Sequence, residues 1–557
     1  MFHRSKKPSL DQPSPEQPGT LAMPKFESRY TRLLPADPET SNGRRQVSGS
    51  CYSRVLPTRV ANPQLLAHSP EVAELLDLDA EFFKSSAFVE TMGGNRLLEG
   101  MDPYATCYGG HQFGSWAGQL GDGRAINLGE RINRRGERWV LQLKGAGPTP
   151  YSRSADGLAV LRSSVREFLC SEAMHHLGVP TTRALALVST GQEVMRDMFY
   201  DGHPKFEPGA VVCRVAPSFT RFGNFELFAS RGEHALLKQF ADYTIETDFP
   251  DFKAPARSTY VDWFAEICRR TADMVAHWMH VGFVHGVMNT YNMSVLGLTI
   301  DYGPYGWVDD FDTNWTPNTT DAQLRRYRFG AQPDIAVWNL AQLGSALSPL
   351  AGAPEPMQEA LGEFSARFEE SWQATMRAKL GLGKAALPGD GALISDLLDL
   401  LSSAETDMTI FFRSLADIDF DLLNDGHEGE ASDKGVMAPV MAPLSKAYYS
   451  SDALPDDHVS KTVAWLRRYA DRIRSEGTPH DVRRAGMNRV NPKYVLRNYL
   501  AQLAIDKAEQ GDPSLVLELL DLLRRPYDDQ PEMEQYAAKR PDWARTRAGC
   551  SMLSCSS

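Results

Sequence analysis

Residues 285–303 read HGVMNTYNMSVLGLTIDYG, a stretch in which polar side chains recur between apolar ones. The preceding segment, 260–279, has apolar residues at helical spacing, so a helix is predicted to lead into a loop beginning near His285. Asn292 and Asp301 lie nine positions apart, on what we predict to be adjoining loops. Amide and carboxylate oxygens are hard donors that suit Mg²⁺. The stretch therefore predicts a magnesium site formed by two loops.

A lysine and a glutamate upstream suit the same chemistry. Lys144 lies in the alternating, β-prone run RWVLQLKGAG (138–147), where a rigid strand can direct an ammonium group at phosphates. Glu167 follows 23 residues later in segment 157–177, whose apolar residues have the spacing of one helical face. We expect Glu167 to orient Lys144 through an ion pair. Either residue alone is more often a solvated surface charge, so the prediction depends on their order in the chain.

The order of these parts is that of protein kinases. A strand lysine, a helix glutamate, an H-x₆-N loop from His285 to Asn292 and the D-F-G-like triplet 301–303 follow one another. Protein kinases carry a catalytic aspartate two residues after the histidine, but Val287 stands there in this chain. The residues therefore predict a kinase-like nucleotide site that performs a different transfer.

The patterns along the chain predict an α+β, protein-kinase-like bilobal fold. A glycine-rich run, the lysine strand and further β-prone runs indicate a mixed, β-rich N-lobe. Helical spacing dominates the second half, for example over 357–380, 393–412 and 494–510. The expected parts are a disordered leader (1–25), the N-lobe (26–231), a mostly helical C-lobe with a helical extension (232–525) and an irregular tail (526–557).

Composition excludes several classes of function. The 557 residues include 59 Lys and Arg against 71 Asp and Glu, a net charge of −12, whereas a general nucleic-acid binder needs a basic surface. No apolar run approaches the roughly 20 residues needed to cross a bilayer. The seven cysteines form no CxxC pair, which argues against a zinc ribbon. We expect a soluble, cytoplasmic protein of bacterial type that binds neither nucleic acid nor membrane.

Two further groups of residues suit phosphate binding. The run 121–124, Gly-Asp-Gly-Arg, offers backbone N–H groups and a guanidinium near the lysine strand. Arg214 and Arg221 lie seven positions apart on β-prone segments of the predicted N-lobe. From spacing alone, these two arginines fit a solubilising surface role as well as they fit ligand binding.

Longer motifs make the chain resemble the selenoprotein O family, kinase-like proteins known in bacteria as protein adenylyltransferases. The resemblance covers roughly residues 26–557 and is carried by YGGHQFGSWAGQLGDGRA, LQLKGAGPTPYSRSADG, VHGVMNTYNMSVLGLTIDYGPYG, NPKYVLRNYLAQ, RRPYD and SCSS. It implies transfer of AMP from ATP to Ser, Thr or Tyr hydroxyls of proteins, including the chain itself. It also implies Mg²⁺ or Mn²⁺ as cofactor and a flipped ATP whose α-phosphate faces the nucleophile. A related version transfers UMP from UTP.

The resemblance also implies roles for individual residues. Glu167 would pair with Lys144 in catalysis, Asn292 and Asp301 would hold the metal, and Tyr291 occupies the position of the general base. The implied nucleotide contacts are Gly121, Gly123, Arg124, Lys144, Asp156, Gly157, Arg214, Arg221 and Asp301.

The base position departs from the family. The family loop reads NTDN, with the aspartate as proposed base, whereas residues 289–292 read NTYN. A tyrosine with a pKa near 10 is ionised in about one molecule per thousand at pH 7. Three interpretations stay open: a natural member with low activity or nucleotide binding only, an altered variant, or a loose transition state that needs no base. We favour impaired transfer.

Two points are left: the role of the cysteine in the C-terminal tail, and two alternative functions. Cys555 lies at the family's cysteine or selenocysteine position, but segment 311–321 contains no cysteine, so no internal disulfide to that segment can form. A redox role for Cys555 is left open. The alternatives are a catalytically silent nucleotide-binding scaffold, favoured by Tyr291, and a γ-phosphate protein kinase, disfavoured by Val287.

Overall fold

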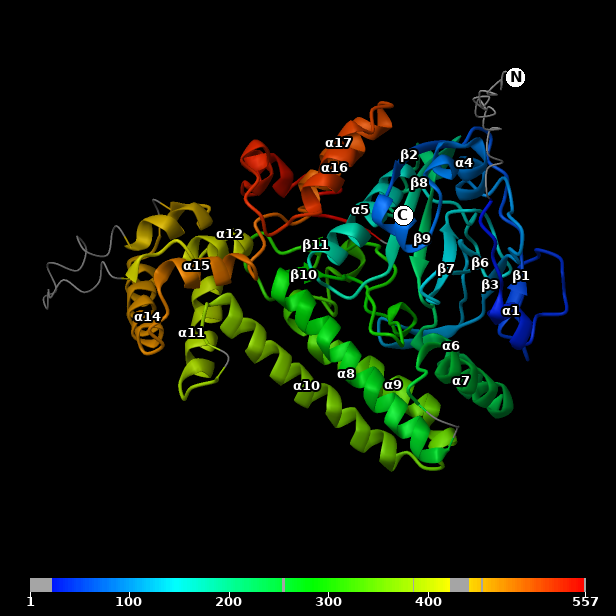
Figure 1. The fold of residues 1–557 in the computed structure, drawn as a ribbon, viewed down its shortest axis with the longest axis horizontal. Coiled ribbons are helices and arrows are strands. Elements are labelled where there is room, and N and C mark those ends of the chain that lie inside the picture. The colour runs from blue at the N-terminus through cyan, green and yellow to red at the C-terminus, as the bar shows by residue number, and fades with distance from the viewer. Residues whose placement is uncertain (1–22, 253–255, 384, 421–439, 452–453, 555–557) are drawn as a thin grey trace, which may run out of the picture.

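A seven-stranded antiparallel sheet organises the N-terminal part of the computed structural model (Figure 1). The structure describes residues 23–252, 256–383, 385–420, 440–451 and 454–554, so most of the predicted leader and Cys555 lie outside the described residues. In sheet order the strands are β1 (Tyr52–Arg54), β3 (Tyr104–Thr106), β6 (Ala125–Ile132), β7 (Arg138–Lys144), β9 (Lys205–Ala216), β8 (Arg183–Arg196) and β2 (Gln64–His68). Among the described residues, two two-stranded sheets lie outside this sheet: β4 (Gly109–Gln112) with β5 (Ser115–Gln119), and β10 (Phe283–Val284) with β11 (Gly306–Trp307).

The alternation in β7 separates a core face from a polar face. Leu141 and Leu143 are fully buried in an apolar cluster, whereas Gln142 and Lys144 alternate with them and face the opposite side. The register places Gln142 opposite Arg214 of β9. Directly paired residues of neighbouring strands share a face, so the lysine strand and β9 present their polar side chains together.

Helix α5 (Leu161–His176) covers one face of the sheet against β8 and β9, in agreement with the helix predicted over 157–177. Its apolar stripe, including Val165, Phe168 and Leu169, is fully buried. It ends before Gly178, whose φ of 78° a residue with a side chain rarely adopts. The shorter helices of this part are α1 (Arg29–Leu33), α2 (Pro70–Leu75), α3 (Ala80–Lys84) and α4 (Ser86–Met92).

Helices dominate from residue 222 onward, so the predicted α+β class, a β-rich first part followed by a mostly helical part, is confirmed. Helices α6 (Phe222–Ser230) and α7 (His234–Asp248) follow the sheet, and the long helices α8 (Arg257–Val281), α9 (Gln332–Ala351) and α10 (Glu355–Lys379) pack together (Figure 1). The short 3₁₀ turns are η1 (Thr290–Asn292), η2 (Thr319–Asp321), η3 (Phe329–Ala331), η5 (Ala442–Ala447), η7 (Pro531–Ala537) and η8 (Asp542–Arg545).

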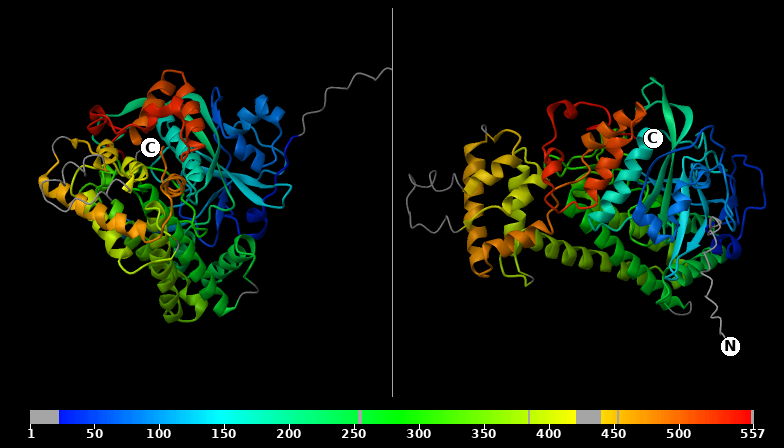
Figure 2. Two further views of the ribbon diagram at one scale, coloured as in Figure 1. Left: turned by 60° about the vertical axis from the view of Figure 1, so that its left-hand side comes forward. Right: turned by 45° about the horizontal axis from the view of Figure 1, so that its top comes forward.

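The remaining helices form a distal group and a returning pair. Helices α11 (Asp390–Ser402), α12 (Met408–Leu415), α14 (Asp456–Arg474) and α15 (His480–Asn488) have their own apolar core, far from the sheet in Figure 2. Helices α16 (Asn498–Glu509) and α17 (Ser514–Leu523) return to pack on α5. The chain then runs to segment 317–319, where the Leu553 N–H donates to the carbonyl of Pro317 at 3.0 Å.

The prediction of one helix over 393–412 was wrong. The chain leaves the helix after Ser402 and starts α12 at Met408, because Asp407 caps the new helix by accepting from the Ile410 N–H at 3.0 Å. The same carboxylate accepts from Arg497 at 2.8 Å. These polar contacts prevail over the apolar periodicity that predicted a continuous helix.

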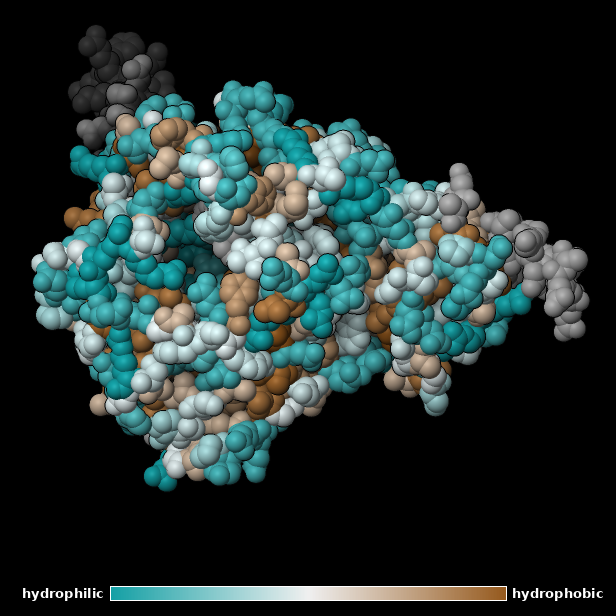
Figure 3. Space-filling model, turned by 180° about the vertical axis from the view of Figure 1, so that it is seen from behind, coloured by the Kyte–Doolittle hydropathy of each residue, from teal (hydrophilic) through white to brown (hydrophobic). Residues whose placement is uncertain are grey.

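The face of the molecule seen in Figure 3 is mainly hydrophilic with scattered apolar residues. Figure 3 shows a hollow with hydrophilic walls on the half of the molecule that holds the sheet. Across the described ranges, no helix combines the length and the apolar character that a membrane span requires.

Replacing Arg497 by Gln should destabilise the fold. Arg497 is 2% exposed and pairs with the buried carboxylates of Asp309, at 2.7 Å, and Asp407. Losing the cation leaves Asp407 without this charge and leaves Asp309 with only the more distant Arg540, at 3.8 Å, so we expect a loss of about 3–5 kcal/mol in urea unfolding. Arg484→Gln, in a half-exposed pair with Asp417, is the control and should change stability by less than about 1 kcal/mol. Equal effects of the two variants would contradict the assigned role.

Candidate nucleotide and metal site

The carboxylate of Asp301 contacts two of the predicted site residues, Arg214 and Arg221. Arg214 of β9 donates from NH1 to Oδ1 at 2.7 Å, and Arg221, at the start of α6, donates from NH1 to Oδ2. Asp301 has a φ of 58°, a left-handed conformation that is uncommon outside glycine and recurs at functional sites. One carboxylate thus joins the sheet and the start of the helical part.

The predicted lysine–glutamate pair lies beside this carboxylate. Lys144 Nζ is 2.7 Å from Oε2 of Glu167, whose other oxygen is 3.1 Å from NH1 of Arg214. The side chains of Glu167 and Arg214 are each 2% exposed, and that of Lys144 is 10% exposed. The structure therefore brings together Lys144, Glu167, Arg214, Arg221 and Asp301, which we call the Asp301 cluster.

The cluster carries more positive than negative charge. Burial acts to raise the pKa of Asp301, but Arg221, Arg214 and Lys144 hold that pKa well below its usual value, so the carboxylate is ionised. Burial lowers the pKa of Lys144, and the neighbouring Glu167 opposes that shift. Three cations face two carboxylates, and the charges of Glu167 and Asp301 also act on Arg124 nearby. An anion would therefore be attracted to this site.

Both arginines keep unmet hydrogen-bonding capacity. Within the described ranges, Nε of Arg214 and NH2 of Arg221 are shielded from solvent and have no hydrogen-bond partner. Buried polar atoms are nearly always paired, so each exception calls for an explanation. Guanidinium donors bind phosphate oxygens with charge-assisted hydrogen bonds. A bound phosphate would supply both the missing acceptors and the missing negative charge.

The loop with Asn292 supplies the second predicted metal donor. Its Nδ2 donates to the carbonyl of Val287 at 2.9 Å, so the amide orientation is fixed and Oδ1 is the end left for a ligand. The described residues contain no group of three or more His, Cys, Asp and Glu side chains that could hold a metal alone. Mg²⁺ commonly takes one or two protein oxygens together with substrate phosphates and water. The amide of Asn292 and the carboxylate of Asp301 fit that kind of site.

Tyr291 is built into the wall of the same site. Its hydroxyl accepts from Nδ2 of Asn289 at 2.6 Å, and its carbonyl accepts from NH1 of Arg221 at 3.0 Å. Its ring stacks with that of Tyr108 at 6.3 Å between centroids, and the guanidinium of Arg221 lies 4.7 Å from the Tyr108 ring. The tyrosine is therefore held by several groups beside the cluster.

The glycine loops form tight turns near the cluster. A side chain at Gly121, where φ is 93°, would place its Cβ 2.5 Å from the ring of Tyr151. At Gly157, where φ is 75°, a Cβ would lie 2.3 Å from the carbonyl of Gly147. The Gly123 carbonyl accepts from the Ser152 hydroxyl. These contacts explain why glycine is required at Gly121 and Gly157 even without a bound nucleotide.

Arg124 and Asp156, two other predicted nucleotide contacts, lie in different surroundings. The carbonyl of Arg124 accepts from the Gly145 N–H at 2.7 Å, next to the end of the lysine strand. Asp156 pairs with Arg196 of β8 at 2.7 Å, and its side chain is 44% exposed. The structure thus places Arg124 near the cluster and Asp156 in an ion pair of its own.

Sequence reasoning missed Gln142 and Phe219, which position the cluster, and named His285 only as the start of the H-x₆-N loop. Gln142 accepts from NH2 of Arg214, and the ring of Phe219 lies 5.3 Å from that guanidinium. Nε2 of His285 lies 2.9 Å from the carbonyl of Ile300 and so links the loop to the residue before Asp301. Burial lowers the pKa of His285. Strand alternation in QLK, which puts Gln142 and Lys144 on one face, was the signal that could have found Gln142.

Comparison with known proteins identifies the class and the family. The profile of the family described as protein adenylyltransferase SelO matches residues 40–524. The chain is 60% identical to the protein nucleotidyltransferase YdiU of Azoarcus sp. (strain BH72) over 532 residues, which are 96% of this chain and 99% of the relative. Similar proteins of the same name from Aromatoleum aromaticum and Rhodopirellula baltica are 59% and 58% identical with equal coverage. The predicted enzyme class, a nucleotidyltransferase, is confirmed. The chain belongs to the SelO family.

Glu167→Gln should destabilise the protein, because the change removes the charge that compensates buried Lys144 and Arg214. We expect a loss of about 3 kcal/mol in urea unfolding at pH 7. Glu363→Gln is a matched control: its partner, Arg269, is 38% exposed, and the expected change is below about 0.5 kcal/mol. A Glu167→Gln variant as stable as the parent would contradict a compensating role for the carboxylate.

Proposed function

We propose that this protein transfers AMP from ATP to hydroxyl groups of Ser, Thr or Tyr residues in other proteins and in itself. In this proposal the Asp301 cluster is a kinase-like nucleotide site between two lobes, and the substrate is ATP in the flipped orientation. UTP is a second candidate donor, because no residue of the cluster distinguishes the base. The cytoplasm is the proposed location.

The observation that carries this proposal is the cationic Asp301 cluster with its unmet guanidinium donors. A triphosphate would accept hydrogen bonds from Arg214 and Arg221 and would offset the excess positive charge. The relatives, named protein nucleotidyltransferases, support a nucleotide rather than another polyanion.

The proposed reaction is a displacement at the α-phosphorus. The hydroxyl oxygen of the target residue forms a bond to the α-phosphorus, and the bond from that phosphorus to the bridging oxygen breaks. Pyrophosphate leaves with the bonding electron pair, and the hydroxyl proton passes to a base or to solvent. Lys144, Arg214 and Arg221 offset the negative charge that grows on the phosphates, while Glu167 keeps Lys144 in position.

In this proposal the carboxylate of Asp301 contacts either the two arginines or the metal ion. Its oxygens are paired with Arg214 and Arg221, which a triphosphate would also bind. Once phosphate oxygens accept from the two arginines, the carboxylate of Asp301 is free to hold Mg²⁺ or Mn²⁺ together with Asn292. The bound metal would supply further neutralisation of phosphate charge. Triphosphate and metal should therefore bind cooperatively.

Labelled ATP tests the proposal directly. The protein and a cell lysate are incubated with Mg²⁺ and ATP carrying the label at either the α or the γ phosphate. We expect protein-bound label from α-labelled ATP alone. Label from γ-labelled ATP alone would indicate a protein kinase and overturn the proposal.

The second candidate function is a silent nucleotide-binding scaffold, and Tyr291 is the specific observation that favours it. A phenol held by Asn289 is a poor base at neutral pH. Nucleotide binding with no label transferred from either phosphate would support the scaffold.

Tyr291→Asp should raise the rate of AMP transfer. The change restores a carboxylate that is ionised at pH 7, and a positioned general base commonly contributes about 10²–10⁴-fold. Tyr291→Phe is the control, which keeps the ring without the hydroxyl and should leave the rate within about twofold of the parent. The measurement is initial-rate transfer from α-labelled ATP. An unchanged rate in Tyr291→Asp would show that the base position was wrongly assigned.

A further inference from the structure

Three arginines gather in a short segment beside the proposed site. Residues 325–328 read Arg-Arg-Tyr-Arg, and we call them the basic segment. They lie between η2 and η3, in a protein whose net charge is −12. Positive charge is therefore concentrated here in a protein that is negative overall. The proposed reaction at the α-phosphorus does not use these arginines.

Hydrogen bonds join the basic segment to the loop that carries Tyr291. The hydroxyl of Tyr327 donates to Oδ1 of Asn289 and accepts from the N–H of Phe113 at 3.1 Å. Nδ2 of Asn289 donates to the hydroxyl of Tyr291. One amide side chain therefore separates the basic segment from the position where the target hydroxyl has to react.

Among the described residues, no ion pair neutralises the three arginines. In the part of the chain that the structure describes, no carboxylate oxygen lies within 4.0 Å of a guanidinium nitrogen of Arg325, Arg326 or Arg328. The buried carboxylate of Asp321 instead accepts from the backbone N–H groups of Arg326 and Tyr327, at 3.0 and 2.7 Å. That carboxylate holds the shape of the segment and offsets part of its charge.

The guanidinium of Arg326 is already positioned. It lies 4.7 Å from the ring of Trp338, and a Cβ at Gly114 would come within 3.3 Å of its Cζ. Its Nε and NH2 are shielded from solvent and have no hydrogen-bond partner among the described residues. Donors fixed in place lose little conformational freedom when they bind an acceptor.

Apolar side chains border the arginines and would add contact area for a peptide. Leu324 is 80% exposed and directly precedes Arg325. Trp116 is 41% exposed, and its ring lies 5.2 Å from that of His111, which in turn contacts Trp338 at 5.3 Å. Exposed aromatic and aliphatic groups next to arginines are typical of protein recognition surfaces.

We propose that the basic segment binds an acidic stretch of the protein substrate, next to the hydroxyl that receives AMP. This inference rests on the proposed function and narrows its substrates to hydroxyls flanked by Asp or Glu. Charge complementarity selects the occupant, because uncompensated arginines attract carboxylates and repel basic segments.

Peptide binding tests this inference without requiring transfer. Two fluorescein-labelled peptides have a central Ser flanked either by four Glu or by four Lys residues, and fluorescence anisotropy measures their binding to the full chain. We expect the acidic peptide to bind at least about tenfold more tightly at low salt, with a difference that shrinks as ionic strength rises. The charge-reversed variant R325E/R328E should lose or invert this preference.

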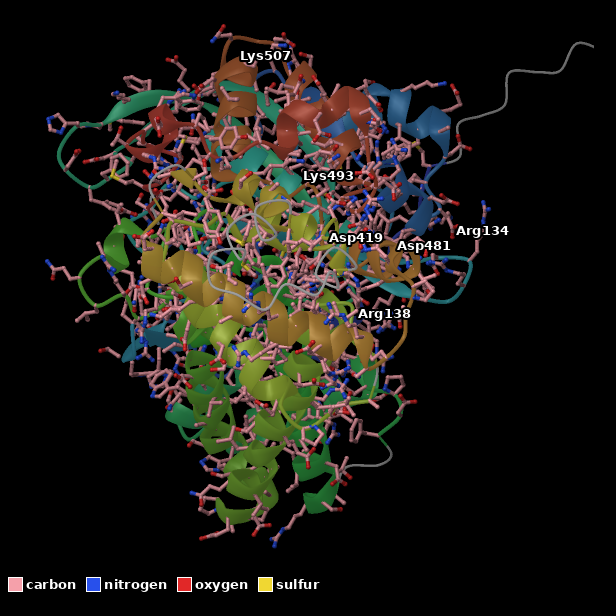
Figure 4. All side chains as sticks on the ribbon, turned by 90° about the vertical axis from the view of Figure 1, so that its left-hand side faces the viewer. Arg134, Arg138, Asp419, Asp481, Lys493 and Lys507 are labelled. Carbon is pink, nitrogen blue, oxygen red and sulfur yellow. The ribbon has the colours of Figure 1, made fainter. Side chains whose placement is uncertain are left out.

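The matched control is R134E/R135E on the β6–β7 turn, where Arg134 projects from the edge of the molecule (Figure 4). It carries the same charge change and should keep the preference for the acidic peptide. R325Q/R328Q, which removes charge without reversing it, should fall between parent and R325E/R328E. Circular dichroism and an unchanged midpoint of urea unfolding establish that each variant is folded.

Equal binding of the two peptides, no binding of either, or a preference that survives in R325E/R328E would overturn the inference. None of these outcomes bears on transfer of α-label to proteins, so failure of this inference and failure of the proposed function remain distinguishable.

Discussion

The contact of Arg214 and Arg221 with the single carboxylate of Asp301 holds the two parts of this protein in register. Arg214 comes from the central sheet, Arg221 from the start of the first helix after it, and Asp301 from a loop 80 residues after Arg221. Arg214 also reaches Glu167, which in turn holds Lys144. The buried charges compensate one another only in part, and that imbalance would attract an anion.

The local parts of this arrangement were predictable from sequence. Alternation identified the strand that ends at Lys144, and helical spacing placed Glu167 on the following helix. The contacts of Arg214 with Gln142 and of Tyr327 with Asn289 depend on sheet register and on loop packing, which no local pattern encodes. The prediction of one continuous helix over 393–412 was wrong for the same reason, because the contacts of Asp407 that separate α11 from α12 are not local.

Binding and transfer depend on different residues in this account. Under the proposed function, the Asp301 cluster binds the phosphates and the metal. In the same proposal, Tyr291 occupies the position that accepts the proton of the incoming hydroxyl. Asn289 links the loop of Tyr291 to the basic segment. A change at the base position can therefore alter the rate while nucleotide binding persists, and the substrate preference can change independently of both.

The coupling between ATP and Mg²⁺ shows whether Asp301 exchanges its arginine partners for the metal. Calorimetric titration of ATP into the parent protein, with and without Mg²⁺, should show at least about tenfold tighter binding with the metal. In Asp301→Asn the arginines are released and the metal loses a ligand, so ATP alone should bind at least as tightly as to the parent, with the effect of Mg²⁺ largely lost. Absence of ATP binding, or unchanged coupling in Asp301→Asn, would contradict the account.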